Sequence, residues 1–193
     1  TYRPCWCGCP TWAGAVLPIL ETPRLLLRPV QPDDDLDAVW QLLLEPEVRR
    51  YLCDDVVLTR GQVSDLLAET LAQASIGLGL WTIRAEEGFI GCVGLLPVSE
   101  TGVAADPAVA GEVEPLVALD PRSWGQGYAA EALAALLAYG FDRLRLPRIV
   151  ALVDLPNTAS HRLLLRLGFW PRRPVPGARH PLWSYVREPF ASA

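Results

Sequence analysis

LDPRSWGQGYAAEALAALLAYG, residues 119–140, runs from the end of a predicted strand through a glycine-containing turn into a long apolar helix. The first N–H groups of a helix have no internal partner and carry partial positive charge, so an anion placed there satisfies them. Gly125 and Gly127 let the backbone approach such an anion closely, because neither residue has a Cβ. The stretch is neither the GxGxxG of a dinucleotide fold nor the GK[ST] of a phosphate loop. Taken alone, it predicts a turn suited to an anion and no particular ligand.

The residues before this stretch predict strands and two helices. Residues 24–30 form a short apolar run that includes Pro29, which is typical of a strand near a sheet edge. Three consecutive aspartates, residues 33–35, precede apolar residues at helical spacing. We expect these carboxylates to cap the helix and complement its dipole, with a cation-binding patch as the alternative. A second helix is predicted from Thr59, a possible cap, to Ser75.

A hairpin and a loop separate the second helix from the glycine-containing turn. Residues 80–85 and 89–98 are predicted strands joined by a short polar turn, and residues 99–111 have loop composition. Residues 113–120 are the next predicted strand. Because Pro115 cannot donate a hydrogen bond, one side of this strand must be unpaired or bulged there.

After the apolar helix the sequence predicts a buried strand, a short helix, a loop and a last strand. The strand covers residues 148–154, and the helix covers residues 157–169 and is closed by Gly168. Residues 170–181 contain four prolines and are expected to be a loop, followed by a strand at 182–188. The order of elements predicts an α+β fold in one domain.

Composition excludes several classes of protein. The chain has 193 residues, of which 51% are hydrophobic and 20% charged, so disorder is not expected. Its longest apolar runs are far shorter than the roughly 20 residues of a membrane span. A net charge of −5 disfavours a nucleic-acid binder, since such domains usually present a basic face.

Residues 1–20 are expected to be a poorly defined extension, with the domain covering residues 21–193. Three of the five cysteines lie here, as Cys5, Cys7 and Cys9. A metal site is the alternative, although the usual ligand spacing is two to four residues and no second pair of cysteines matches. The odd cysteine count and the lack of an export signal favour a reducing cytoplasm.

Four segments resemble, in order and spacing, one protein family. Arg122–Gly127 fits the [QR]xxGx[GA] pattern of the GNAT acetyltransferases. The segments are TPRLLLRP (22–29), EPEVRRYL (45–52), LDPRSWGQGYAAEAL (119–133) and NTASHRLLLRLGF (157–169). They are similar to the branch of ribosomal-protein N-terminal acetyltransferases (RimJ/RimL-like). The resemblance covers about residues 22–190.

The resemblance implies a fold and a set of acetyl-CoA contacts. The fold would be a single mixed, mostly antiparallel sheet with helices on both faces and a splayed central strand pair. The backbone around Arg122 and from Trp124 to Ala129 would hold the pyrophosphate, and the exposed backbone of residues 117–119 would pair with the pantetheine arm. Trp124 has packing as an alternative role, and Asn157 has helix capping beside cofactor contact. The implied cofactor-binding residues are Val117, Ala118, Leu119, Arg122, Trp124, Gly125, Gln126, Gly127, Tyr128, Ala129 and Asn157.

Two residues are implied as catalytic groups. Ser160 matches the family position whose hydroxyl lies near the thioester sulfur, where it would stabilise or protonate the leaving thiolate. A serine that bonds its own backbone is the alternative, and no tyrosine, which many relatives use, lies in its helix. Glu114 aligns with a glutamate that would serve as base through water if burial raises its pKa, or it is a surface carboxylate. Pro115-Leu116 replaces the Gly-Tyr pair usual in the branch.

Two histidines have simpler interpretations. His161 is expected to face solvent. His180 lies in the predicted loop with Arg172, Arg173 and Arg179, and this cluster would contact the 3′-phosphate of CoA, an acidic acceptor, or solvent alone.

The resemblance therefore implies a cytoplasmic, acetyl-CoA-dependent N-acetyltransferase that works by direct transfer, without a covalent enzyme intermediate or a metal. The expected acceptor is the amine of a protein N-terminus, with a small amine or aminoglycoside as the alternative. A non-catalytic acyl-CoA-binding module is the rival of another class. No nucleic-acid or membrane partner is expected, and the family allows a homodimer.

Overall fold

The computed structural model describes residues 17–98, 109, 111–177 and 179–189. Within these residues the strands are β1 Leu20–Glu21, β2 Leu26–Pro29, β3 Gly79–Ala85, β4 Gly88–Pro97, β5 Val113–Leu119, β6 Ile149–Asp154, β7 Trp170–Val175 and β8 Leu182–Arg187. The α-helices are α1 Pro32–Leu44, α2 Pro46–Arg49, α3 Arg60–Ala72, α4 Tyr128–Ala138 and α5 Thr158–Arg166. Short turns of other helix types are η1 Cys53–Asp55, η2 Gln73–Ile76, η4 Pro121–Ser123 and the π-helical η5 Tyr139–Arg143. None of the described helices is long and apolar enough to cross a membrane.

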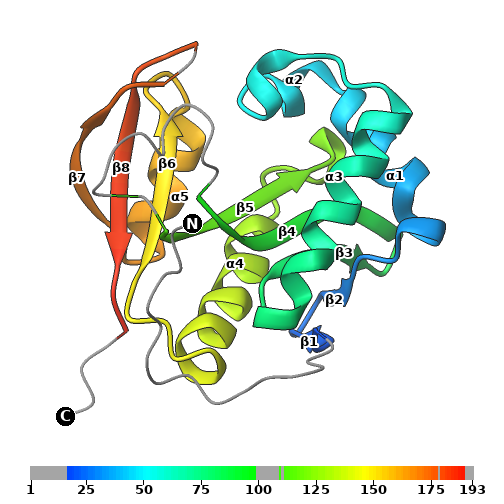
Figure 1. Cartoon of the computed structure of the whole chain (residues 1–193), viewed down its shortest axis with the longest axis horizontal. Helices are drawn as coiled ribbons and strands as arrows, with labels where there is room; N and C mark the ends of the chain where they lie inside the picture. The colour runs from blue at the N-terminus through cyan, green and yellow to red at the C-terminus, as the bar shows by residue number, and fades with distance from the viewer. Residues whose placement is uncertain (1–16, 99–108, 110, 178, 190–193) are drawn as a thin grey trace, which may run out of the picture.

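The strands form two antiparallel ladders that meet at β5 and β6. The first ladder has the order β1-β2-β3-β4-β5, and the second has the order β6-β8-β7. Strands β5 and β6 contact each other, but their ribbons diverge toward their C-terminal ends (Figure 1). The expected α+β class and the splayed pair are confirmed. The splay also divides the expected single sheet, because β5 and β6 are too far apart along part of their length to continue the ladder.

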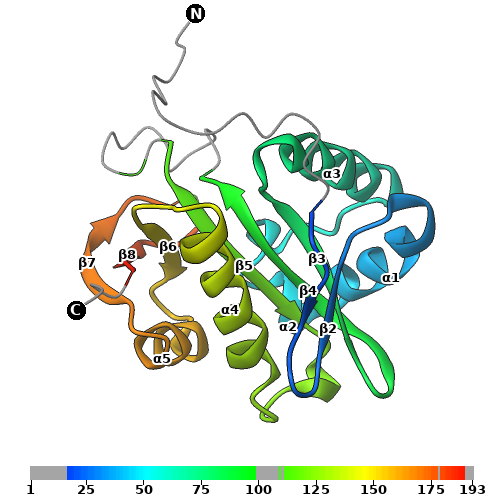
Figure 2. The same ribbon diagram turned by 90° about the horizontal axis from the view of Figure 1, so that it is seen from below.

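Helices cover both faces of the five-stranded ladder (Figure 2). Helices α1 and α3 pack on one face, where Leu80, Cys92 and Ala118 of the strands belong to the same buried cluster. Helix α4 covers the other face, where its leucines pack against Trp81 and Val93. Both faces are apolar because alternate residues of a strand point to opposite sides.

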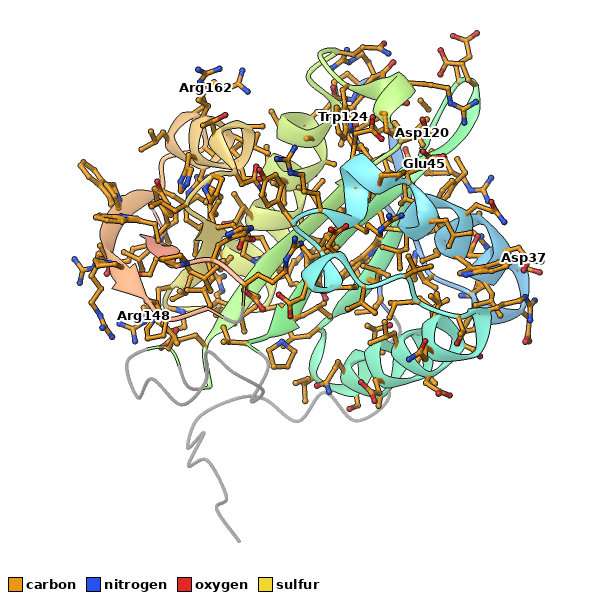
Figure 3. The ribbon with its side chains drawn as sticks, turned by 90° about the horizontal axis from the view of Figure 1, so that it is seen from above. Asp37, Glu45, Asp120, Trp124, Arg148 and Arg162 are labelled. Carbon is orange, nitrogen blue, oxygen red and sulfur yellow. The ribbon has the colours of Figure 1, made fainter. Side chains whose placement is uncertain are left out.

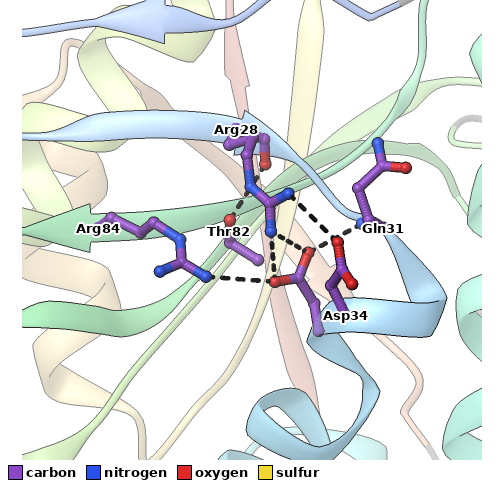
Figure 4. Close-up of polar contacts among 6 residues, drawn as sticks. Arg28, Gln31, Asp34, Thr82 and Arg84 are labelled. Carbon is purple, nitrogen blue, oxygen red and sulfur yellow. Dashed lines mark hydrogen bonds and ion pairs between the residues drawn. The ribbon is translucent and has the colours of Figure 1, made fainter.

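A buried carboxylate fixes the start of α1 on the sheet. The Asp35 side chain is 1% exposed and lies 2.6 Å from Nη2 of Arg28 on β2 and 3.5 Å from Nη2 of Arg84 on β3. It also accepts the backbone N–H of Gln31 at 2.8 Å (Figure 4). Asp33 and Asp34 are exposed. The expected cap is therefore not found, because the N-cap is Gln31 and has no side-chain cap hydrogen bond; the third aspartate is instead the buried partner of two arginines.

Helix α3 begins as the sequence predicts, but its α-helical turns end at Ala72 and the 3₁₀ turn η2 replaces the expected helix as far as Ser75. The Thr59 hydroxyl accepts the Gln62 N–H at 3.3 Å, and the Gln62 side chain accepts the Thr59 N–H at 2.9 Å, which completes a capping box. After η2 the chain leaves the helix through Gly77, whose φ is +79°. This left-handed conformation suits a glycine.

The prediction that residues 170–181 form a loop is wrong for their first half. Strand β7 occupies Trp170–Val175 and pairs only with β8 in the part of the chain that the structure describes. The register shifts between Pro171 and Pro174. An edge strand tolerates proline because the missing N–H can face away from its single neighbour. The prolines of this segment are equally compatible with an edge strand and with a loop. Pairing with β8 makes the segment an edge strand.

We expect Asp35→Ala to lower the free energy of unfolding by about 3–5 kcal/mol, because it leaves two arginines without their buried partner. Asp33→Ala in the same helical turn is the matched control and should cost less than about 1 kcal/mol. Urea unfolding followed by circular dichroism measures both. Equal losses in the two variants would mean that the buried pairing does not hold α1.

Candidate functional site

Hydrogen bonds at the two ends of the β4–β5 ladder show which residues of β5 direct their backbone N–H and C=O groups to β4. Val98 donates its N–H to Glu112 O at 2.8 Å, and Asp120 donates its N–H to Ile90 O at 2.9 Å. Both pairs lie on the register of β4 and β5, which has no irregularity between them. In an antiparallel pair, directly opposite residues alternate between bonded and non-bonded pairs. The even-numbered residues of β5 therefore bond to β4, and the odd-numbered ones direct their backbone groups to the other edge.

The edge of β5 that is not paired with β4 borders the opening where β5 and β6 diverge. Pro115 lies at such a position, so its missing N–H costs no ladder bond, and of the two expectations for Pro115 the unpaired side is found rather than a bulge. Leu119 directs its carbonyl to the same edge, where the indole Nε1 of Trp124 donates to it at 2.8 Å. Ala118 bonds to β4 instead. Within residues 117–119, Val117 and Leu119 both direct N–H and C=O to the opening, but the Leu119 carbonyl already accepts from Trp124.

The turn after β5 is held by Asp120. Its carboxylate accepts the backbone N–H of Arg122 at 2.9 Å and the Arg122 guanidinium at 2.6 Å. The hydrogen bond from the Arg122 side chain outweighs desolvation and lowers the pKa of Asp120. Trp124, 49% exposed, follows at the same end of the molecule as Glu45 and Asp120, whereas Arg148 lies at the opposite end (Figure 3).

The backbone at both glycines of the turn is left-handed. Gly125 has φ +76° and Gly127 has φ +83°. A Cβ built on Gly125 would meet no protein atom within 4 Å, and one built on Gly127 would meet only Nη2 of Arg24, at 3.5 Å. The glycines are thus required by backbone conformation, and the space beside them is open to a ligand.

Helix α4 presents free donors to this space. It begins after Gly127 without a side-chain cap, and its first internal hydrogen bond runs from Glu131 N–H to Gly127 O at 3.1 Å. The N–H groups of Tyr128, Ala129 and the next residue therefore precede the first helical bond. An uncapped helix start beside a left-handed turn fits a pyrophosphate.

Helix α5 begins at the end of β6, on the side where β5 and β6 diverge (Figure 1). Asn157 caps it by accepting the Ser160 N–H at 3.2 Å, as the capping alternative predicts. The Ser160 hydroxyl is half-buried and makes no hydrogen bond within the described residues. The alternative in which this hydroxyl bonds its own backbone is therefore not found.

His161 is half-exposed, and its ring makes two contacts that the expected solvent-facing side chain would not make. Its Nδ1 lies 2.7 Å from the hydroxyl of Tyr185 on β8, and its Nε2 lies 3.2 Å from Leu155 O. A tautomer that donates from Nε2 to the carbonyl and accepts at Nδ1 from the tyrosine satisfies both contacts. Sequence reasoning missed this role because Tyr185 is 24 residues away in the chain.

Glu114 lies on β5 on the same face as Leu116 and Ala118, the face covered by α1 and α3. Burial raises the pKa of its carboxyl from 4.5 to about 7. A carboxyl with such a pKa exchanges protons near neutral pH, which suits a general base.

A cleft of about 510 Å³ lies between the α2–η1 segment and the turn that joins β7 to β8. It is lined by Pro46, Glu47, Arg49, Arg50, Asp55, Arg179 and His180. It adjoins the end of β6, because Tyr51, which follows Arg50 of its lining, donates from its hydroxyl to Pro156 O at 3.4 Å. The cleft is therefore next to the β6–α5 connection that carries Asn157.

Asp55 is the central charge of this cleft. Its two carboxylate oxygens lie 3.2 Å from Nε of Arg49 and 3.3 Å from Nη1 of Arg179. It follows Cys53 and Asp54 in a run of three left-handed residues, with φ of 52°, 52° and 63°. Left-handed backbone costs about 1–2 kcal/mol per residue outside glycine, less for aspartate, so the two ion pairs hold a strained turn.

The structure separates the predicted basic cluster of the proline-rich segment. Arg179 and His180 line the cleft, whereas Arg172 and Arg173 are exposed on strand β7. The single loop expected from the sequence would have kept all four together. The four side chains are separated because Arg172 and Arg173 belong to β7, which pairs with β8.

In the described part of the chain, no group of three or more His, Cys, Asp or Glu side chains is arranged to hold a metal ion. Cys5, Cys7 and Cys9 lie outside that part. Cys92 is buried, and its burial raises the pKa of the thiol, while Cys53 is exposed.

One residue near the glycine turn was not singled out from the sequence. Arg24 donates from Nη1 to Gln126 O at 3.0 Å, and its guanidinium lies 4.6 Å from the centre of the Tyr128 ring. The only sequence signal was its place in the TPRLLLRP segment, which gives no role to this arginine.

The chain has relatives among known proteins. Residues 24–170 match the profile of the family described as Acetyltransferase (GNAT) domain. The chain is 32% identical over 157 residues to the uncharacterized N-acetyltransferase YoaA of Bacillus subtilis, a match that covers 80% of this chain and 84% of YoaA.

Solved structures share the fold. RimL, a ribosomal alpha-N-protein acetyltransferase in complex with coenzyme A, superimposes with a TM-score of 0.73 at 18% identity, covering 89% of this chain and 98% of RimL. The spermidine N-acetyltransferase of Vibrio cholerae, in complex with CoA and spermine, superimposes with a TM-score of 0.69 at 17% identity, covering 86% of this chain and 96% of that one.

The raised pKa of Glu114 predicts a pH-dependent stability difference. The folded state holds this proton more tightly than the unfolded chain, so the wild type loses stability as pH rises from 4.5 to about 7. Glu114→Gln carries no charge and lacks this loss. We expect the variant and the wild type to be similar below pH 4.5 and the variant to be more stable above pH 7.

Urea unfolding across this pH range measures the difference, with Glu86→Gln in the exposed β3–β4 turn as control. A difference between Glu114→Gln and the wild type that does not change with pH would contradict the burial of the charge.

Proposed function

We propose that this chain, which belongs to the GNAT acetyltransferase family and is an N-acetyltransferase, transfers the acetyl group of acetyl-CoA directly to the N-terminal amine of a protein or peptide. The observation that carries the proposal is the combination of an open glycine turn at an uncapped helix start with a strand edge that faces the splay. Together they offer backbone donors to a pyrophosphate and a pairing partner to an extended chain.

The glycine turn and the edge of β5 would hold different parts of acetyl-CoA. When bound, acetyl-CoA supplies an acetyl thioester that an amine can attack. The N–H groups from Gly125 to Ala129 would bind the pyrophosphate, whereas the Trp124 N–H expected to join them already donates to Pro121 O at 3.1 Å. The N–H and C=O of Val117 would pair with the amide groups of the pantetheine arm. Asn157 keeps its side-chain amide nitrogen for a further contact, since only the oxygen is used in capping Ser160.

Two groups would handle the protons. The attacking amine must be neutral, and Glu114, with a pKa of about 7, would take its proton directly or through water. The Ser160 hydroxyl has no other hydrogen bond within the described residues and would donate to the departing sulfur. Correct positioning of amine and thioester would contribute most of the rate.

The cleft beside β6 favours a peptide over a polycation. A polyamine or aminoglycoside needs several carboxylates that are free to pair with it. Of the two carboxylates that line this cleft, Asp55 is already held by two arginines, which leaves Glu47. Small amines remain the second candidate, because a relative in fold is a spermidine N-acetyltransferase. A non-catalytic acyl-CoA-binding module would not need the raised pKa of Glu114.

A reducing compartment such as the cytoplasm is our proposal for the place of the reaction. It is supported by Cys53 and Cys92, which are both free thiols.

We expect Gly125→Asp to weaken CoA binding at least roughly tenfold, because it places a negative charge where the pyrophosphate would lie. Gly111→Asp is the matched control. Gly111 has the same φ of +76°, and a Cβ built there also meets no atom within 4 Å. Isothermal titration calorimetry with CoA gives both dissociation constants. If both variants bind CoA as the wild type does, the turn is not the pyrophosphate site.

The acceptor class is tested by CoA release from acetyl-CoA with peptides of varied N-termini, polyamines and aminoglycosides. We expect turnover with free peptide N-termini, none with N-acetylated peptides, and little with polycations. In Glu114→Gln, kcat/KM should fall by about 10²–10⁴-fold. The limb of the pH profile near pH 7 should disappear, while the limb from the acceptor amine, with a pKa of about 7.7–8.0, should remain.

Glu86→Gln is the control for this experiment. An unchanged pH profile in Glu114→Gln would assign the base to another group. Turnover of polyamines alone would replace the peptide by a small amine, and binding without any turnover would favour the acyl-CoA-binding module.

A further inference from the structure

The start of α4 contains a negative charge that opposes the proposed ligand. Glu131 lies in the first turn of the helix, and its side chain is 17% exposed. A carboxylate at this end complements the helix dipole, but it repels a pyrophosphate bound to the same N–H groups. A functional cradle therefore needs a group that neutralises Glu131.

Arg24, from the turn between β1 and β2, is that group. Its Nη2 lies 2.6 Å from Oε2 of Glu131, and its Nε donates to the same oxygen at 2.7 Å. Oε1 accepts the backbone N–H of Arg24 at 3.0 Å and the hydroxyl of Thr22 at 2.7 Å. Partial desolvation raises the pKa of Glu131, but the hydrogen bonds from Thr22 and Arg24 outweigh it and lower that pKa. Glu131 is thus ionised and matched by one positive charge.

The same guanidinium also holds the glycine turn. Its Nη1 donates to Gln126 O at 3.0 Å. Because the peptide group is planar and trans, fixing this carbonyl also fixes the direction of the Gly127 N–H. Nη2 lies 3.5 Å from the position of a Cβ on Gly127, and the guanidinium stacks on the ring of Tyr128.

We propose that Arg24 is a positioning residue of the pyrophosphate cradle, which it prepares by neutralising Glu131 and by fixing the peptide between Gln126 and Gly127. The inference rests on the proposed binding of acetyl-CoA at this turn. It assigns no contact with the reacting atoms to Arg24.

Calorimetric titration of CoA into four proteins tests the inference: the wild type, Arg24→Gln, Glu131→Gln and the double variant. We expect Arg24→Gln to bind CoA roughly tenfold more weakly, because the charge of Glu131 is then unmatched near the anion. Glu131→Gln should bind roughly threefold more tightly, and the double variant should return to within about threefold of the wild type. In steady-state assays, Arg24→Gln should raise KM for acetyl-CoA and change kcat little.

A matched control and a conservative variant separate this role from a structural one. Arg60, which pairs with Asp37 at 2.7 Å on the surface, is a control whose change to Gln should leave CoA binding unaltered. Arg24→Lys keeps the charge and should bind CoA more tightly than Arg24→Gln, even if both are less stable than the wild type.

The outcomes are distinguishable from a failure of the proposed function. If the wild type does not bind CoA, the proposed function fails. If the wild type binds CoA and Arg24→Gln binds it equally well, the role of Arg24 is overturned and the function stands. If the double variant binds as weakly as Arg24→Gln, the neutralisation of Glu131 is overturned.

Discussion

The divergence of β5 from β6 is the constraint around which the rest of the site is arranged. A strand that leaves its neighbour exposes backbone N–H and C=O groups, and such groups cost free energy when no partner satisfies them. Along β5, Pro115 has no N–H to satisfy, Trp124 donates to the carbonyl of Leu119, and the N–H and C=O of Val117 both face the opening.

The alternation of the same strand places the chemistry. Because the β4 ladder fixes which backbone groups face the opening, it also fixes which side chains face α1 and α3. Glu114 lies on that face, where burial raises the pKa of its carboxyl to about 7. Helix α1, which packs on that face, is in turn held by Asp35, the buried partner of Arg28 and Arg84.

Charges around the opening are paired before any ligand enters. Arg24 matches Glu131 at the start of α4, and Asp55 matches two arginines in the cleft beside β6. The pairing of Arg24 with Glu131 leaves backbone donors, rather than side-chain charges, as the main attraction for an anion at the glycine turn. The cleft, by the pairing of Asp55 with two arginines, has few free carboxylates with which to attract a polycation.

The sequence by itself determined the features that depend on neighbours within a few residues. The caps at Thr59 and Asn157 and the glycine turn at 125–127 were predicted, because each depends only on residues a few positions apart. The resemblance of four segments to one family added the fold and the splay, which no local pattern contains.

Tertiary structure alone decided the features whose partners are distant in the chain. Glu131 is 107 residues from Arg24, Asp35 meets Arg84 across 49 residues, and His161 reaches Tyr185 across 24. The same holds for β7, where prolines were compatible with a loop until β8 lay beside them. A short-range pattern indicates which groups need a partner. The partner itself is determined by long-range packing, because many distant residues are chemically equivalent and only the fold brings one of them near.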